Sequence, residues 1–238
     1  MPIADLPPGE WTPLLIGDQW PSYSSLEAIS AGASSRQILS SAFEDYSDLL
    51  LDIKHRNLDP QEGITAEDAS GAFARGGTHS GQIAQSNAVK RGVYTTVHDK
   101  VVELRTGLRK LAAKGNDRIN DVNRSERPLP DKIVEILEIV TTTREEAFVQ
   151  TAGCAGYISD QIRMVLGAQG IDTSAQEFAA VRGVDPTKRV PTNTGELEAE
   201  IGRKLDQLNG TGSTGLPVSA ATGTSKPPLG DQGVQAYT

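Results

Sequence analysis

The feature that most restricts the fold is one run of helical periodicity more than fifty residues long. From about Thr65 to Val122, apolar residues recur at steps of three and four, which is the spacing of an amphipathic helix. At about 1.5 Å per residue, an unbroken helix of this length would be roughly 80 Å long, well beyond the width of a compact domain. The chain therefore needs an elongated architecture, unless this helix is broken at Gly76-Gly77 or near Gly92.

Two further long helices flank this run. The first begins at Pro21, a residue type that is tolerated in the first turn of a helix, and it ends before Pro60. Thr65, with Asp68 three residues later, resembles the capping box that opens a helix. A third helical pattern covers residues 131–166, and no segment shows the alternation of a strand. We therefore predict an all-α fold, an elongated bundle of long antiparallel helices that comprises a helical hairpin and a third long helix.

Composition and turn residues divide the 238 residues into four segments. Hydrophobic residues make up 37% and aromatic residues 5%, which fits slender helices with one apolar stripe better than a thick core. The end of the chain is rich in Gly, Ser, Thr and Pro, as is typical of a disordered tail or linker. The predicted segments are a proline-rich lead-in (1–21), the long-helix bundle (22–167), a loop with short helices (168–208) and the tail (209–238).

Charge is unevenly distributed along the chain. The net charge of −8 argues against general nucleic-acid binding, because phosphates would repel such a protein. Residues 1–68 hold twelve acids and three bases, whereas residues 90–127 hold ten bases and five acids. This difference favours an acidic first helix beside a basic second one in an antiparallel hairpin. The alternative is that two solvated faces have opposite signs by chance.

The glycine pair Gly76-Gly77 lies inside the longest helical pattern. Each glycine costs up to about 1 kcal/mol relative to alanine in a helix interior. That cost is tolerable where a second helix packs closely, so the pair marks either a point of close approach or a kink. The alternative is a simple break between two ordinary helices.

Residues that could carry catalysis or bind metal are sparse. His55, His79 and His98 lack metal-ligand spacing, and His98 with its neighbour Asp99 is expected to point to different sides of a helix. Cys154, the single cysteine, lies among small residues and is expected to pack between helices. We therefore predict no enzyme activity, no cofactor and no metal site.

Targeting signals are also sparse. No apolar run approaches the roughly 20 residues that a transmembrane helix requires. The first residues lack the basic and apolar segments of a signal peptide. The sequence therefore favours a protein that either stays in the cytosol or leaves the cell by a route that reads folded protein.

The order of these features resembles a known family. The chain has a Trp-containing segment, a helix, a turn with a glycine and then "AEDASGAF", which opens a longer helix. This order resembles the helical-hairpin substrates of type VII (ESX) secretion. These substrates include the WXG, PE and PPE proteins and the N-terminal domains of actinobacterial secreted effectors. The stretch "GDQWPSYSSLEAI", at 17–29, is similar to the Trp-Pro start of larger effectors. The resemblance covers roughly residues 11–124.

Two positions depart from the family pattern. The turn at 57–63 has Gln61 where the WXG signature has tryptophan. The export signal of the family, Tyr followed four residues later by Asp or Glu, belongs after the second hairpin helix. Tyr23 and Glu27 have this spacing but lie in the first helix. Tyr157 and Asp160 lie late enough but are one residue too close.

The resemblance implies a protein that works by association. It implies a helical partner or self-association, recognition by secretion machinery or a chaperone, and action in the cell envelope or outside after a cytoplasmic stage. Two alternatives remain: a cytosolic or phage or envelope structural assembly protein, and the targeting domain of a toxin whose catalytic part lies beyond residue 238. The candidate interface residues are Trp20, Phe43, Tyr46, Phe73, Gly76 and Gly77.

Overall fold

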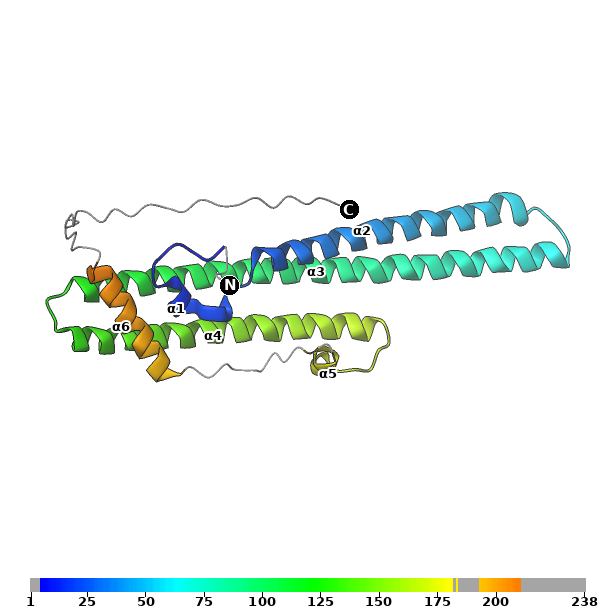
Figure 1. Cartoon of the computed structure of the whole chain (residues 1–238). Coiled ribbons are helices and arrows are strands. Elements are labelled where there is room, and N and C mark those ends of the chain that lie inside the picture. Colours follow the sequence, from blue (N-terminus) through cyan, green and yellow to red (C-terminus); the bar gives the residue numbers. More distant parts are fainter. Residues whose placement is uncertain (1–4, 182, 184–192, 211–238) are drawn as a thin grey trace, which may run out of the picture.

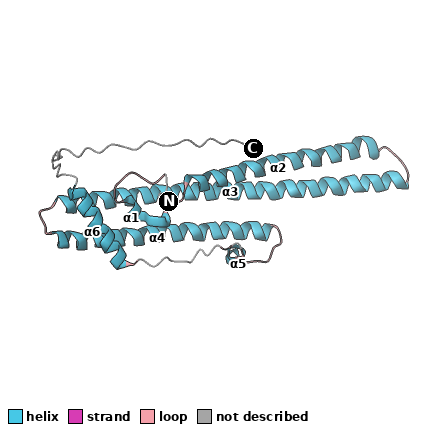
Figure 2. Cartoon of the chain, in the orientation of Figure 1, coloured by secondary structure: helices cyan, strands magenta, loops and turns pink. Residues whose placement is uncertain are grey.

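The structure, a computed structural model, describes residues 5–181, 183 and 193–210. This part of the chain contains helices and no strand, as predicted (Figure 2). The prediction of a disordered tail falls almost wholly on residues 211–238, outside the described part. The elements are α1 (Thr12–Ile16), the 3-10 turn η1 (Gly17–Gln19), α2 (Tyr23–Ile53), the π-helical turn η2 (Lys54–Leu58), α3 (Ile64–Arg124), α4 (Leu129–Ala168), α5 (Ala175–Ala180) and α6 (Thr194–Gly210).

The 61-residue helix α3 organises the whole molecule. Its N-terminal half pairs with α2, and its C-terminal half pairs with α4, so the bundle is elongated (Figure 1). In the described part of the chain, α2 and α4 do not contact each other. The molecule therefore consists of a two-helix arm, residues 34–90, and a thicker body around the second half of α3.

The glycine pair is a point of close approach within an unbroken α3. A Cβ atom added at Gly77 would lie 2.9 Å from Cγ of Leu51, so only glycine fits against α2 at this position. Ser47 Oγ donates a hydrogen bond of 2.8 Å to the Gly77 carbonyl, and Ser40 Oγ donates one of 2.9 Å to the Ala84 carbonyl. Small residues and serine hydroxyls therefore hold the two arm helices together.

The predicted capping box at the start of α3 is wrong. The helix begins at Ile64, so Thr65 already lies inside its first turn. The residue before the helix is Gly63, with a φ of 113°, which L side chains rarely adopt. At the start of α2, by contrast, a side chain does cap the helix: Ser22 Oγ accepts a hydrogen bond of 3.2 Å from the Ser25 N–H.

The structure favours the second explanation of the uneven charge, in which the two hairpin helices have solvated faces of opposite sign. Among the described residues, no ion pair joins α2 to α3. The register explains this, because Ser40 lies opposite Ala84 and Ser47 lies opposite Gly77. The acidic part of α2 thus faces the start of α3, while most of the basic stretch lies beyond the end of α2, in the body.

The hydrophobic core lies in the body. It is built from α1, the second half of α3, α4 and α6, and it includes side chains with no exposed surface. Gly115 allows Leu15 of α1 to lie directly on α3, since an added Cβ atom would be 2.7 Å from Leu15 Cδ2. The fully buried core side chains are Trp11, Leu15, Ile16, Leu108, Ala112, Ile119, Ile136, Val140, Ala147, Ile201 and Leu205.

Polar contacts fix the N-terminal segment onto the body. Asn116 of α3 accepts a 2.9 Å hydrogen bond from the Trp11 N–H and donates one of 3.0 Å to Thr12 Oγ1. Arg105 donates to Asp5 at 2.9 Å and lies 4.4 Å from the Trp20 ring. The segment that the sequence marked as a proline-rich lead-in therefore contributes directly to the core.

Candidate interaction surface

The arm exposes apolar side chains on the face of α2 that points away from α3. Ile38 is 69% exposed, Tyr46 51% and Leu49 52%. The steps from Ile38 to Tyr46 and from Tyr46 to Leu49 are eight and three residues, which keep these side chains on one side of the helix. We call these three residues the α2 stripe. The opposite side of α2, which carries Ser40 and Ser47, is buried against α3.

An acidic row borders the stripe. Asp45 precedes Leu49 by four residues, and Asp48 follows Asp45 by three, so these side chains are neighbours on the helix surface. Both carboxylates are exposed, and neither forms an ion pair within the described chain. Asp52, one turn further, pairs with Arg56 at 2.7 Å.

The predicted interface residues lie in different environments. Trp20 is only 4% exposed and belongs to the core, so its side chain packs inside the chain. Gly76 and Gly77 lie against Leu50 and Leu51 of α2. Phe43 and Phe73 are partly buried, and Tyr46 is the predicted residue with a large exposed side chain.

Sequence reasoning missed Ile38 and Leu49 as surface residues. Both belong to the apolar periodicity of the first helix, and neither was among the candidate interface residues. The helix α2 has apolar residues on two sides, so its sequence does not show which side remains exposed. Only the position of α3 shows this.

A cluster at the tip of the arm closes the turn between α2 and α3. The Asp59 carboxylate accepts hydrogen bonds from Lys54 at 2.8 Å and from Ser70 at 2.8 Å, and lies 3.0 Å from His55 Nδ1. The hydrogen bonds from Lys54 and Ser70 lower the pKa of Asp59 to about 2. The Asp59 carboxylate is the group that contacts all the other members of this cluster. In a catalytic triad, by contrast, the imidazole of histidine lies between the other two residues.

The prediction that His98 and Asp99 point to different sides of the helix is wrong. His98 Nδ1 lies 3.3 Å from Asp99 Oδ1, so the two neighbours do meet on the surface of α3. Both side chains are at least partly exposed, and each is oriented toward the other although the two residues are adjacent in the helix.

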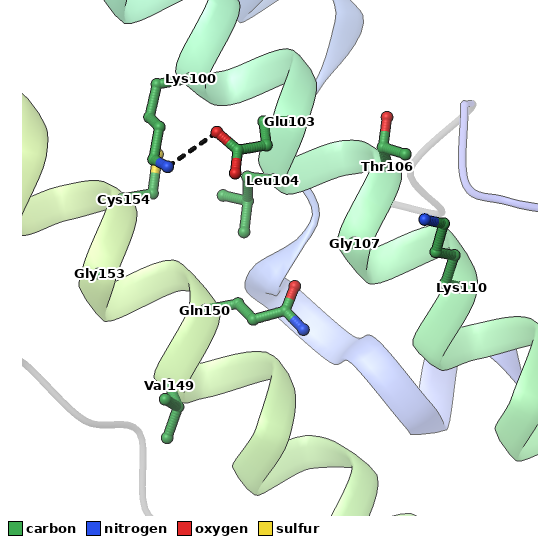
Figure 3. A pocket seen from close by; sticks show the side chains of 10 residues that line it. All are labelled: Lys100, Glu103, Leu104, Thr106, Gly107, Lys110, Val149, Gln150, Gly153 and Cys154. Carbon is green, nitrogen blue, oxygen red and sulfur yellow. Dashed lines mark hydrogen bonds and ion pairs between the residues drawn. The ribbon is translucent and has the colours of Figure 1, made fainter.

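An open groove of about 660 Å³ lies in the body between α3 and α4 (Figure 3). Its α3 wall includes Lys100, Glu103 and Lys110, and its α4 wall includes Val149 and Gln150. Lys100 donates a 2.8 Å hydrogen bond to Glu103, which raises the pKa of the lysine.

Cys154 lies on the α4 side of this groove. It is 4% exposed, in agreement with the expected packing role, and burial raises the pKa of its thiol. A raised pKa keeps sulfur in the thiol form, which is a weaker nucleophile than the thiolate.

The two candidate export pairs differ in exposure. Tyr23 is 59% exposed in the first turn of α2, with Glu27 exposed one turn later. Tyr157 is partly buried, with Lys100 Nζ 5.9 Å from the centre of its ring, and Asp160 lies 3.4 Å from Arg163. The first pair is therefore the more accessible of the two.

The described chain holds no group of three or more His, Cys, Asp or Glu side chains arranged to bind a metal ion. Nor does any described helix combine the length and apolar character needed to span a bilayer.

Fold and surface together define an elongated helical protein with an exposed two-helix arm. Over 233 residues the chain is 25% identical to the uncharacterized protein Rv2082 of Mycobacterium tuberculosis, a match that covers 94% of this chain. The matched region spans 31% of that relative's length. No family model and no solved structure matches the chain. The similarity connects the chain to an actinobacterial protein.

Proposed function

We propose that this chain is a non-enzymatic association module of a type VII secretion substrate or effector. In this proposal it binds a helical partner or another copy of itself through the arm. Secretion machinery or a chaperone then recognises it in the cytoplasm, and it acts in the cell envelope or outside the cell without having used a signal peptide.

The observation that carries the proposal is the α2 stripe. Ile38, Tyr46 and Leu49 are each at least half exposed on an arm only two helices thick. Clustered apolar side chains on a protein surface mark interaction sites more often than chance. Full burial of these three side chains by a partner would contribute about 3–5 kcal/mol, before the cost of association.

The shape of the arm indicates the kind of partner. A pair of antiparallel helices buries its second face when one or two further helices pack alongside it, as in a four-helix bundle. Because the stripe follows one side of α2, the complementary surface is expected to be an apolar helix face or a groove between two helices.

The sequence resemblance supports the secretion context. The Trp segment, the long hairpin and the small residues at the start of α3 follow the order found in type VII substrates. The similarity to a mycobacterial protein is compatible with this context, because type VII substrates include actinobacterial proteins.

Export is tested in an actinobacterial host that carries a type VII system. We expect the protein in the culture filtrate, and we expect it to be lost from the filtrate when the secretion ATPase gene is deleted. A variant with Tyr46→Asp and Leu49→Asp should accumulate in the cells, whereas Met164→Asp with Ile171→Asp, two exposed apolar residues outside the arm, serves as the matched control. Retention of the unaltered protein in the cell would instead favour a cytosolic or phage or envelope assembly protein.

A second candidate is the targeting domain of a larger toxin. The similarity to a longer relative favours this candidate, because the matched region spans only 31% of that relative's length. A reporter enzyme fused after residue 238 should reach the culture filtrate if this candidate holds. A fusion that stays in the cell while the unfused chain is exported would contradict it.

A further inference from the structure

Two unmatched charge clusters lie far apart on the molecule. Asp45 and Asp48 are exposed on the arm, and Lys110 and Lys114 are exposed on the body. None of the four forms an ion pair within the described part of the chain. The α2 acids lie level with the region of Gly77 on α3, so about 35 residues of helix, roughly 50 Å, separate them from the lysines. The two clusters cannot meet within one molecule.

The lysines border the groove between α3 and α4. Between residues 104 and 116, α3 carries four bases and no acid. Arg105 is bound to Asp5, whereas Lys110 lines the groove and Lys114 follows one turn later. We call the surface made by Lys110, Lys114 and the groove the body seam; Figure 3 shows Lys110 near one end of the groove and the Lys100–Glu103 pair at another.

The body seam also has apolar surface. Val149, on the α4 wall of the groove, is 61% exposed, and Leu104 lines the groove from α3. The seam thus places a basic pair beside an apolar depression. The arm places the acidic pair Asp45 and Asp48 beside the apolar α2 stripe. In each pair the two charges are about one helical turn apart, so the spacing of the acids matches the spacing of the bases.

We propose that the occupant of the α2 stripe is the body seam of a second copy of this chain. Two copies lie antiparallel, and the arm of each packs along the seam of the other, so that Asp45 and Asp48 face Lys110 and Lys114 twice. This inference rests on the proposed association function and names its partner. A stable interface buries roughly 1,200–2,000 Å² in total, and a two-fold pair divides that requirement between two equivalent contacts.

The charges beside the α2 stripe favour a second copy of this chain, and not an unrelated helix, as its partner. An apolar stripe by itself would accept many helix faces, but the acidic row beside it selects a surface with basic residues at the same spacing. The body seam is such a surface on the same chain. Because these charges are exposed, the pairing should weaken as salt screens them.

The test is the solution mass of the full 238-residue chain by sedimentation equilibrium over a range of protein concentrations. At low salt we expect a concentration-dependent species with about twice the 25.3 kDa mass of the chain. At high salt the dissociation constant should rise. A monomer at every concentration would overturn the inference, and the export experiment would then still test whether the arm serves another partner.

Charge reversal locates the interface. A variant with Asp45→Lys and Asp48→Lys has a basic arm and a basic seam, so its dissociation constant should rise on the order of tenfold or more. A variant with Lys110→Glu and Lys114→Glu has an acidic arm and an acidic seam, and it should weaken equally. Mixing the two variants should restore the dimer, because both contacts then join opposite charges.

Two results would overturn the seam contact even if the chain dimerises. The first is an unchanged dissociation constant in either variant, and the second is a mixture that remains monomeric. Glu62→Lys with Glu67→Lys, two exposed acids at the arm tip, changes the net charge by the same amount and should leave the dimer intact. Circular dichroism confirms that each variant keeps its helices.

Discussion

The arm and the body share the helix α3 but are stabilised by different means. In the body, large apolar side chains such as Leu108, Ile119 and Ile136 have no exposed surface. In the arm, the contact between α2 and α3 depends on small residues and on serine hydroxyls, with Ser47 bonded to the carbonyl of Gly77. Large side chains of the arm are partly buried or exposed. The body is therefore the folding unit, and the arm is a surface that depends on it.

This difference predicts a difference in local stability. Segments with few buried apolar contacts open at lower free energy than segments in a core. The arm has one helical neighbour for each helix, whereas the body surrounds α3 with α1 and α4. Hydrogen exchange should therefore be faster in residues 34–90 than in the second half of α3.

Leu15→Ala should have the largest effect on stability. Leu15 is fully buried and lies against Gly115 of α3, so its truncation removes apolar contacts and leaves a cavity. We expect a loss of about 3–4 kcal/mol in the free energy of unfolding. Both tryptophans of the chain, Trp11 and Trp20, lie in this core, so urea unfolding followed by tryptophan fluorescence measures it. A loss below about 1 kcal/mol would mean that α1 does not belong to the folding unit.

Gly77→Leu should loosen the arm and leave the body intact. An added Cβ atom at this position would lie 2.9 Å from Leu51, and the longer side chain would push α2 away at a cost of about 1–3 kcal/mol. Faster hydrogen exchange in the arm, with an unchanged tryptophan transition and unchanged helix content, is the expected result. Gly92→Leu is the matched control, because a Cβ atom there meets nothing within 4 Å. Equal exchange rates in the two variants would contradict the close approach.

Acid should weaken the tip of the arm before it affects the body. The hydrogen bonds from Lys54 and Ser70 lower the pKa of Asp59 from 3.8 to about 2. A lowered pKa means that the folded tip is stabilised above pH 3.8, and that this stabilisation is lost as the pH falls from there toward about 2. Protection factors at the tip, which correct the hydrogen-exchange rates for their intrinsic pH dependence, should fall through this interval in the unaltered protein. In Asp59→Asn the pH dependence at the tip should disappear, and its persistence would assign the effect to another group.

The class of fold could be read from the sequence because long helices have a regular signal. The periodicity placed the third helix at 131–166, and α4 covers Leu129–Ala168. The buried position of Cys154 also followed from its small neighbours. These features are local, so a single segment contains the information that determines them.

Contacts between distant segments could not be predicted in the same way. The helix α1 has only five residues, too few to show a period, and its place in the core depends on Gly115 a hundred positions later. The offset of α2 along α3 decides which charges face each other, and composition does not contain that offset. The same limit applies to the candidate interface, whose predicted residues included Tyr46 but not Ile38 or Leu49.

Leu49→Ala should have the smallest effect on folding, and for that reason it is the sharpest contrast with Leu15→Ala. The residue types are identical, but Leu49 is 52% exposed and Leu15 is fully buried. Truncation of Leu49 should change the free energy of unfolding by less than about 0.5 kcal/mol, measured where the chain is monomeric. The same change should weaken dimerisation in sedimentation experiments, because it removes an apolar contact made only between molecules. A leucine that contributes to association and not to folding is the property expected of an arm that exists for a partner, whereas a large loss of monomer stability would place the outer face of α2 inside the folding unit.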